Sequence, residues 1–431
     1  MFSSVQTQRV ESIFQIVTIS FIPLFLGSED KITPIIMTKV TFIKTTIWKR
    51  IVLPAFFKDC KVRFVGIKKL RHEMVSGKDL PKTNNDEIVA FWSASEVSNP
   101  ELNKLALDLR SQGIKVIRIE DAFIRSNGLG CNFFYPYSLS IDRAGIYYDP
   151  SRPSDLENIL IGLRKRSDYL RLRVRAENLR QSVMEYGVTK YHTGSHAKPV
   201  PEVAAILRDN PGKFNRVIFI PAQVDKDASV IKGGLGYNTY SLICRVRKDN
   251  PHALLIVKIH PDVLIGLRGG LLGINDLASS VDFLCTDRYT SLDLIEIADE
   301  VHTISSLTGF EALIRGKKVV CYGMPFYAGY GLTQDVSTED GNGIAVQACK
   351  RRKVANLDIT DLVIGSLILY PRYFNWDTGC VASAEEIIAV LHNHPEGTRQ
   401  NRILLIRSKL YRQIRKLYTL ILKMFGRISS E

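Results

Sequence analysis

Two loops carry carboxylates where they could take part in chemistry, and each follows an apolar run typical of a β-strand. The first holds the adjacent pair Glu120 and Asp121, and the second holds Asp227 beside Lys226. Adjacent carboxylates raise each other's pKa, which suits general base catalysis on a hydroxyl group. A carboxylate close to a lysine stays ionised and can act as a nucleophile or an electrostatic stabiliser. An acidic turn and a polar loop explain the same residues, so spacing alone leaves both interpretations open.

Cations and hydroxyl groups follow other apolar runs. Lys258 and His260, the latter followed by a proline, end one such run, and two cationic donors suit a phosphate. Ser305 and Ser306 precede a helix-like segment, where hydroxyl and free N–H groups bind phosphate well. A capped strand end and a capped helix are the local alternatives. These positions predict a site for an anionic, phosphorylated ligand.

Four more residues stand close to these positions. Thr308 and Glu311 have the spacing of a capping box, in which Thr308 would cap the helix that Ser305 and Ser306 precede. Arg125 and Ser126 follow the carboxylate pair, and a guanidinium group binds a carboxylate through paired hydrogen bonds. Taken alone, Arg125 is more often a surface charge.

Strand-like and helix-like segments alternate in two series. The expected strands are 88–92, 116–119, 138–142 and 145–149 in the first series, and 217–220, 254–257, 281–284, 300–303 and 318–321 in the second. Helices are expected at 101–112 and, densely basic, within 155–185. Such alternation is typical of α/β folds, whose ligands sit outside the carboxyl ends of the strands. We therefore expect two Rossmann-like domains facing across a cleft, joined by a linker at 193–201.

The expected division of the chain has four parts. They are a leader or basic segment at 1–60, an N-terminal Rossmann-like domain at 61–200, a C-terminal Rossmann-like domain at 201–390 and a basic amphipathic tail at 391–431. The apolar run 13–26 is short for a membrane span, which needs about 20 residues. Because Met37 offers another start, residues 1–36 are expected to be a dispensable leader or an over-extended start.

Charge and cysteine content narrow the class of protein. The chain has 431 residues and a net charge of +14, which fits nucleic acid, an anionic membrane face or anionic substrates. No nucleic-acid-binding motif accompanies the charge, so nucleic acid is not an expected partner. The seven cysteines are scattered without a C-x-x-C pair, which fits a reducing cytoplasm. Residues 401–427 contain eight Lys/Arg and no Asp/Glu, and their apolar residues recur at helical spacing. This pattern is typical of a helix that lies on a membrane surface, but it also fits a helix packed on its own domain.

Taken in order, these stretches resemble the bacterial capsule-polysaccharide β-Kdo transferases, where Kdo is 3-deoxy-D-manno-oct-2-ulosonic acid. The matching stretches are 120–130, 145–149, 223–227, 258–262, 305–316, 322–329 and 369–373, within about residues 85–390. The resemblance implies a GT-B-like enzyme that uses CMP-β-Kdo and retains the β configuration. The domain 61–200 would then face the acceptor, and 201–390 would bind the CMP-sugar. Many family members carry two transferase modules, whereas this chain has one copy of each motif.

The resemblance also implies roles for individual residues. Asp227 would be the nucleophile that holds a transient Kdo adduct, and Glu120 or Asp121 would be the acid/base that serves the acceptor hydroxyl. Contacts to the CMP part would come from the second domain. Its phosphate would be bound by Lys258 and His260, with His260 assisting its departure, and by Ser305, Ser306 and Thr308. Glu311 would contact the ribose or cytosine, and Gln223 would be a further substrate contact. From chemistry alone, we expect Arg125 to pair with the Kdo carboxylate, with Ser126 beside it.

The expected function is therefore transfer of Kdo from CMP-Kdo to a surface-glycan or lipid-linked acceptor, without a metal or other cofactor. The expected location is cytoplasmic, peripheral at the inner face of the inner membrane, with an anionic membrane surface as a partner. Two alternatives remain open: a transferase for another CMP-linked nonulosonic acid, such as sialic acid, and a non-catalytic capsule assembly or export protein.

Overall fold

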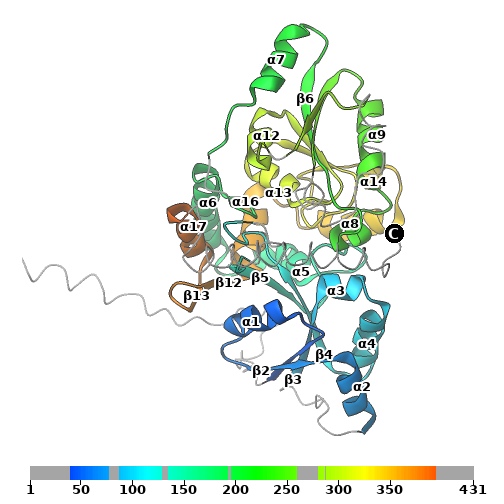
Figure 1. Ribbon diagram of the computed structural model, residues 1–431, viewed down its shortest axis with the longest axis vertical. Coiled ribbons are helices and arrows are strands. Elements are labelled where there is room, and N and C mark those ends of the chain that lie inside the picture. The colour runs from blue at the N-terminus through cyan, green and yellow to red at the C-terminus, as the bar shows by residue number, and fades with distance from the viewer. Residues whose placement is uncertain are drawn as a thin grey trace, which may run out of the picture.

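A computed structural model describes residues 39–76, 87–128, 134–192, 196–259, 280–286 and 288–394. The expected leader at 1–36, His260 and the amphipathic tail at 401–427 lie outside these ranges. The described chain forms two α/β units, which lie one above the other in Figure 1. Within the described ranges, no helix combines the length and the apolar character needed to cross a bilayer.

The first unit is built on a seven-stranded sheet in the order β13-β12-β5-β4-β3-β1-β2. The strands are β1 (Lys39–Ile43), β2 (Lys61–Val65), β3 (Glu87–Trp92), β4 (Lys115–Asp121), β5 (Ser138–Asp142), β12 (Pro371–Asn375) and β13 (Cys380–Ala382). Strands β2, β1, β3 and β4 are parallel, whereas β5, β12 and β13 are antiparallel to their neighbours. The first five strands lie in the order 2-1-3-4-5, so the direction of winding reverses between β1 and β3. In such sheets, ligands bind at the carboxyl ends of the two strands that flank this switch point.

Helices cover both faces of the first sheet because successive side chains of a strand point to opposite faces. The helices are α1 (Ile47–Phe56), α2 (Ile67–Ser76), α3 (Ser93–Val97), α4 (Pro100–Ser111) and α5 (Asp155–Gly162). In β3, Ile88 and Ala90 pack in the cluster that contains α1, whereas Val89 and Phe91 pack in the cluster that contains α2 and α4. The expected helix at 101–112 is therefore confirmed as α4, and the sequence specifies its start through the Asn99 side chain, which caps Leu102 N–H.

The second unit is built on a parallel six-stranded sheet in the order β8-β7-β6-β9-β10-β11. The strands are β6 (Arg216–Pro221), β7 (Ala253–Lys258), β8 (Phe283–Cys285), β9 (Glu300–Thr303), β10 (Lys318–Cys321) and β11 (Gln334–Asp335). This is the 3-2-1-4-5-6 order of a Rossmann fold, whose switch point lies between β6 and β9. The fold class predicted from the sequence, two Rossmann-like domains, is confirmed.

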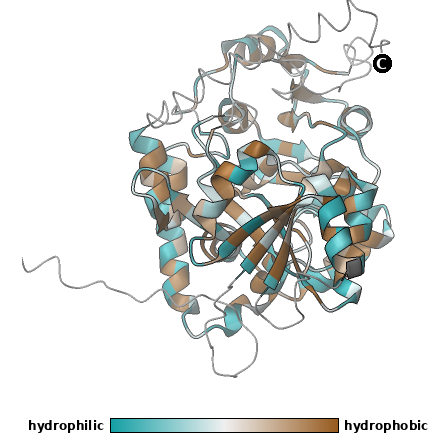
Figure 2. Cartoon of the chain, turned by 60° about the horizontal axis from the view of Figure 1, so that its bottom comes forward, coloured by the Kyte–Doolittle hydropathy of each residue, from teal (hydrophilic) through white to brown (hydrophobic). Residues whose placement is uncertain are grey.

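Near-continuous apolar strands explain why the second sheet is buried on both faces. Ile218 and Leu255 pack with α9, whereas Phe219 and Ile256 pack in the cluster that contains α12 and α13. The strands of the first sheet are apolar too: Figure 2, in which the first unit faces the viewer, shows them largely in brown beside helices that carry both colours. The remaining helices are α6 (Tyr169–Glu185), α7 (Pro201–Asp209), α8 (Ala228–Gly233), α9 (Thr239–Asp249), α12 (Ser291–Ile297), α13 (Leu307–Ile314), α14 (Val336–Glu339), α15 (Gly343–Lys353), α16 (Ile359–Val363), the π-type η3 (Ile364–Leu369) and α17 (Ala384–Asn393).

Sheet membership divides the chain differently from the ranges expected from sequence. Strands β12 and β13 lie inside 201–390 yet join the first sheet, where Arg372 pairs with Leu139. Strand β1 and helix α1 lie in the basic part of the segment 1–60, which was expected to stand outside the first domain, yet Val40 and Phe42 are buried in the first core. The many cations between residues 39 and 58 hid this from the sequence, because they lie beside the buried positions.

The expected strand at 145–149 is wrong. This segment forms a turn, in which Asp149 N–H donates to the carbonyl of Ile146 at 3.0 Å. A Cβ on Gly145 would meet the carbonyl oxygen of Pro153 at 2.6 Å, so a close approach of two backbones explains the glycine. The turn brings Tyr147 and Tyr148 to the junction of the two units, where Tyr147 packs against Phe326.

Candidate active site

The carboxylate of Glu120 lies at the carboxyl edge of the first sheet. It accepts a hydrogen bond of 3.0 Å from the backbone N–H of Ala94, in the first turn of α3. Burial and the charge of Asp121 raise the pKa of Glu120 to about 7, while the ammonium group of Lys49 opposes this rise. A carboxyl group that titrates near neutral pH can accept and return a proton under working conditions, which is the requirement for general acid–base catalysis.

Asp121 is held by Arg125 instead. Arg125 Nε donates to Asp121 Oδ2 at 2.7 Å, and Nη1 donates to the Ser126 hydroxyl at 2.9 Å and to the carbonyl of Phe134 at 3.2 Å. Arg125 is only 4% exposed, and the Ser126 hydroxyl in turn donates to the carbonyl of Gly128 at 2.6 Å. In this structure Arg125 and Ser126 therefore hold Asp121 in place. Their expected contact with a sugar carboxylate stays a prediction.

Two lysines that the sequence analysis did not select accompany the carboxylate pair. Lys49 on α1 holds its Nζ atom 3.6 Å from the centre of the Trp92 ring. Lys190 follows α6, and although burial opposes its charge, Tyr191, Tyr147 and the carboxylate pair together raise its pKa. Lys49 lies in a stretch rich in Lys and Arg, and Lys190 belongs to no motif, so the sequence gives no signal that could have distinguished them. Only the packing of these stretches against the sheet edge selects them.

Asp227 belongs to the second unit, as the N-cap residue of α8. Its Oδ1 atom accepts hydrogen bonds from the backbone N–H of Ser229 at 3.0 Å and from the Ser229 hydroxyl at 2.9 Å. Helix α8 packs on α3, whose first turn holds Glu120. Tyr148 donates to Ser93 at 2.7 Å, and burial, with the charges of Glu120 and Asp227, raises its pKa well above the usual value. Carboxylates from both units thus act on one tyrosine.

Gln223 joins the two strand ends at the switch point of the second sheet. Its Oε1 atom accepts from Ser305 N–H at 2.9 Å and from the Thr303 hydroxyl at 3.3 Å, and its Nε2 atom donates to the Ser305 hydroxyl at 3.2 Å. The Ser305 hydroxyl donates to the carbonyl of Ser229, in α8, at 3.1 Å. The structure therefore brings Gln223, Ser305 and the helix of Asp227 together at the position where ligands bind in this fold.

The start of α13 differs from the expected capping box. Ser306, not Thr308, is the N-cap residue, because the Ser306 hydroxyl accepts from Thr308 N–H at 3.2 Å. Glu311 does not reach back to the cap. Its Oε1 atom accepts from Lys190 N–H at 2.8 Å, and burial raises its pKa. Glu311 therefore links α13 to the segment after α6, and its expected contact with the ribose or cytosine stays a prediction.

Lys258 ends β7 and is buried. Its Nζ atom donates to the backbone carbonyls of Thr286, at 2.9 Å, and Tyr289, at 2.5 Å. The lysine thus holds the loop between β8 and α12 against the end of its own strand. The expected phosphate contacts of Lys258 and His260 stay predictions, and His260 lies outside the described residues.

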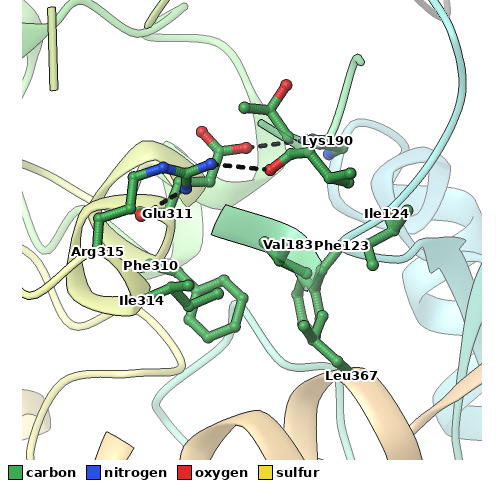
Figure 3. A pocket seen from close by; sticks show the side chains of 11 residues that line it. Phe123, Ile124, Val183, Lys190, Phe310, Glu311, Ile314, Arg315 and Leu367 are labelled. Atoms are coloured by element: carbon green, nitrogen blue, oxygen red, sulfur yellow. Dashed lines mark hydrogen bonds between the residues drawn. The ribbon is translucent and has the colours of Figure 1, made fainter. Parts of the chain in front are cut away.

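A cavity lies beside Glu311, where the two units meet (Figure 3). The space that the centre of a water-sized sphere can reach is about 20 Å³, which is room for about one water. Phe123 and Phe310 line its apolar side, and Arg315 closes it by donating to the carbonyls of Glu311 at 2.9 Å and Val188 at 3.2 Å. This cavity is too small for a sugar nucleotide.

The loop after β10 packs tightly against α8, which gives a stability prediction. A Cβ on Gly323 would lie 2.3 Å from the carbonyl oxygen of Gly233 and 2.7 Å from that of Ile304. Gly323→Ala is expected to destabilise the fold by about 1–3 kcal/mol, the usual cost of overpacking. Urea unfolding measures the loss. Gly162→Ala, where no atom lies within 4 Å of the added Cβ, is the control, and equal stability of the two variants would contradict the close approach.

Among the residues that the structure describes, no three His, Cys, Asp or Glu side chains are grouped to hold a metal ion. The expectation of chemistry without a metal stays a prediction.

Comparison with known proteins fixes the family. Residues 97–186 and 161–373 match the family described as "Capsule polysaccharide biosynthesis protein". The chain belongs to this family. Its relatives include the "Lipopolysaccharide-processing protein LpsZ" of Rhizobium meliloti, 34% identical over 80% of this chain and 72% of that protein. Another is the "Capsule polysaccharide modification protein LipA" of Neisseria meningitidis serogroup A, 35% identical over 80% of this chain. This chain spans only 44% of the length of LipA.

Two solved structures resemble this member of the capsule family over almost their whole length. They are parts of KpsC from Thermosulfurimonas dismutans, described as a β-Kdo 2,4 transferase and a β-Kdo 2,7 transferase. The first has a TM-score of 0.63 at 29% identity and covers 84% of this chain and 98% of its own. The second has a TM-score of 0.58 at 30% identity and covers 82% of this chain and 99% of its own.

Proposed function

We propose that this chain is a retaining glycosyltransferase that moves Kdo from CMP-β-Kdo to a surface-glycan or lipid-linked acceptor in capsule synthesis. The observation that carries the proposal is the packing of α8, which Asp227 caps, on α3, whose first turn holds Glu120 by a hydrogen bond. Likeness to two Kdo transferase structures supports the choice of sugar. Two carboxylates on a sugar-transferring fold suit a double displacement, in which one is a nucleophile and the other handles a proton.

In the first half of the proposed reaction, Asp227 attacks the anomeric carbon of Kdo. A bond forms between its carboxylate oxygen and that carbon, and the bond to the CMP phosphate breaks, so that CMP leaves with the electron pair. Two hydrogen bonds from Ser229 fix the Asp227 side chain, because both end on its Oδ1 atom, at 3.0 and 2.9 Å. In this proposal Ser305, Ser306 and the N-terminus of α13, which Ser306 caps, bind the departing phosphate.

In the second half, the acceptor hydroxyl attacks the same carbon and releases Asp227. Glu120 takes the hydroxyl proton, because it titrates near neutral pH, whereas the Arg125 guanidinium holds Asp121 in an ion pair. Two inversions give net retention. The structure thus favours Glu120 as the acid/base, a choice that the sequence left open.

The direct test is donor turnover. The full chain is incubated with CMP-Kdo made in situ and with Kdo-bearing acceptors, and products are followed by mass spectrometry. A product heavier by one Kdo, with release of CMP, supports the proposal. Competition between CMP-Kdo and CMP-sialic acid separates the main proposal from a transferase for another nonulosonic acid. Absence of turnover with any CMP-sugar would instead favour a non-catalytic assembly or export protein.

His260 gives a prediction about donor binding, based on its place two residues after Lys258. His260→Ala is expected to weaken CMP binding by about 1.5–3 kcal/mol, because a hydrogen bond to a charged group is lost. Isothermal titration with CMP measures the change, and His252→Ala, on an exposed turn before β7, is the control. Unchanged affinity in folded His260→Ala protein would remove His260 from the donor site.

The basic tail gives a prediction about location. Deletion of residues 400–431 is expected to release the protein from anionic vesicles but to preserve transfer to a soluble acceptor. Each basic residue near such a surface contributes roughly 1 kcal/mol of attraction. Vesicle co-sedimentation at two salt concentrations measures binding. Loss of solubility, or of activity on soluble acceptors, would show that the tail belongs to the folded core and not to a membrane contact.

A further inference from the structure

Lys49 occupies the ligand-binding edge of the first sheet. Its helix, α1, follows β1 directly and is capped by Thr46, whose hydroxyl accepts from Lys49 N–H. Its Nζ atom lies 3.6 Å from the centre of the ring of Trp92, the last residue of β3. A cation over an indole face is attracted by the ring. Because the strand order reverses between β1 and β3, this lysine stands at the switch point of the sheet.

The strand pairing also brings Glu120 close to Trp92, over whose ring Lys49 lies. Trp92 pairs with Ile119 across the parallel strands β3 and β4, so Glu120 is the next residue along β4. Two residues beyond Trp92, the N–H group of Ala94 donates to the Glu120 carboxylate at 3.0 Å. The ammonium group lies within electrostatic reach of Glu120, and it favours the charged form of that carboxyl group.

Lys49 is held there by its helix. The ring of the preceding residue, Trp48, stacks on Tyr135 with ring centres 5.0 Å apart and planes 7° apart, and Tyr135 stacks on Trp376 at 4.5 Å. Leu53 and Phe56 bury the opposite end of α1 in the first core. A surface lysine samples many rotamers, whereas this one is half-buried on an anchored helix.

We propose that Lys49, fixed over Trp92 at the switch point of the first sheet, is a positioning residue for proton transfer by Glu120, and that its ammonium group stabilises the carboxylate form which receives the acceptor's proton. This inference rests on the proposed function, because it gives Glu120 the acid/base role. The arrangement uses an opposite charge to keep a buried carboxylate available as a base.

The direction of the pH dependence follows from the groups that face Glu120. These groups are Asp121 on the same strand, Lys49 on α1, Lys190 after α6, Tyr147 and Tyr148 in the turn, and Arg125 beyond the strand. Burial lowers the pKa of Lys49 to about 8, and burial raises that of Glu120 to about 7. Below a pH of about 7 Glu120 is protonated, and above a pH of about 8 Lys49 loses its charge. Between these two pH values both groups are charged and form an ion pair.

A pH titration of the Glu120 carboxyl group tests the inference directly. It is followed by carbon-13 NMR of the glutamate-labelled full chain without donor, and the Glu120 signal is assigned by its loss in Glu120→Gln. Lys49→Met and Lys49→Gln are expected to raise the proton affinity of Glu120 by about tenfold, the effect of removing a nearby opposite charge. Lys49→Arg is expected to change it little. Arg50→Met, which removes a charge from the exposed face of the same helix, is the control and is expected to change nothing.

Transfer kinetics give the second measurement. In Lys49→Met, the acidic limb of the kcat profile is expected to move to higher pH with KM for the donor unchanged, and Lys49→Arg is expected to restore it. An unchanged Glu120 titration in folded Lys49→Met and Lys49→Gln proteins would overturn the inference. Because the titration needs no donor, that outcome is distinct from failure of the proposed function, which would appear as absence of transfer by the wild-type protein at every pH.

Discussion

Asp227→Asn is expected to abolish Kdo transfer and to leave CMP binding intact. The amide cannot attack the anomeric carbon as a carboxylate does, but its side-chain oxygen can still accept the two bonds from Ser229 and cap α8. Intact-mass spectrometry of wild-type protein given donor without acceptor should show a Kdo-sized increase, and peptide mapping should place it on Asp227. CMP affinity, measured by titration, should stay within about twofold of wild type if no contact worth 0.4 kcal/mol is lost.

Asp225 offers a matched control in the same loop. Its Oδ1 atom accepts from Thr239 N–H at 3.0 Å, so it holds the start of α9. Asp225→Asn keeps an acceptor at this position and should retain transfer. A fully active Asp227→Asn enzyme, or an adduct that maps to Glu120 or Asp121, would overturn the assignment of the nucleophile.

Glu120→Gln is expected to reduce transfer by about 10²–10⁴-fold, the usual contribution of a positioned general acid or base. Donor cleavage does not need this residue, so the Kdo adduct on Asp227 should accumulate in the variant. The wild-type rate should rise with pH through a midpoint near 7, because Glu120 must be ionised to accept a proton, and burial raises its pKa to about 7. Single-turnover kinetics with and without acceptor measure both steps.

The stability of the same variant separates function from folding. A carboxyl group whose folded pKa is raised binds more protons in the folded state, so it costs stability as pH rises from about 4.5 through about 7. Glu120→Gln should therefore be at least as stable as wild type at pH 8 in urea. Asp121→Asn removes the ion-pair partner of the buried Arg125 guanidinium and, because that charge is left unpaired, is expected to destabilise the fold by about 3–5 kcal/mol. A Glu120→Gln protein that loses activity together with stability would argue for a structural role.

The amino-acid sequence by itself determined most of the strands of this protein and predicted where its chemistry would lie. Short apolar runs, separated by helix-like segments, predicted β3, β4, β6, β7, β9 and β10. A strand that is buried on both faces needs such a run. Polar residues directly after these runs predicted where chemistry would gather, since the carboxyl ends of parallel strands meet at one edge. Asp227, Gln223 and Ser305 were selected as site residues in this way, and the structure joins Gln223 and Ser305 by hydrogen bonds.

Only the tertiary structure decided the features that depend on residues far apart in the chain. Strand β12 pairs with β5 although more than two hundred residues separate Arg372 from Leu139, and no local pattern reports such a pairing. The proposed role of Glu120, rather than Asp121, as the acid/base rests on Ala94 and Arg125, and the proposed role of Lys49 rests on Trp92. Electrostatic environment is a property of packing, because burial and neighbouring charges together set each pKa. Sequence names the titratable groups, and the folded neighbours determine which of them carries the proton.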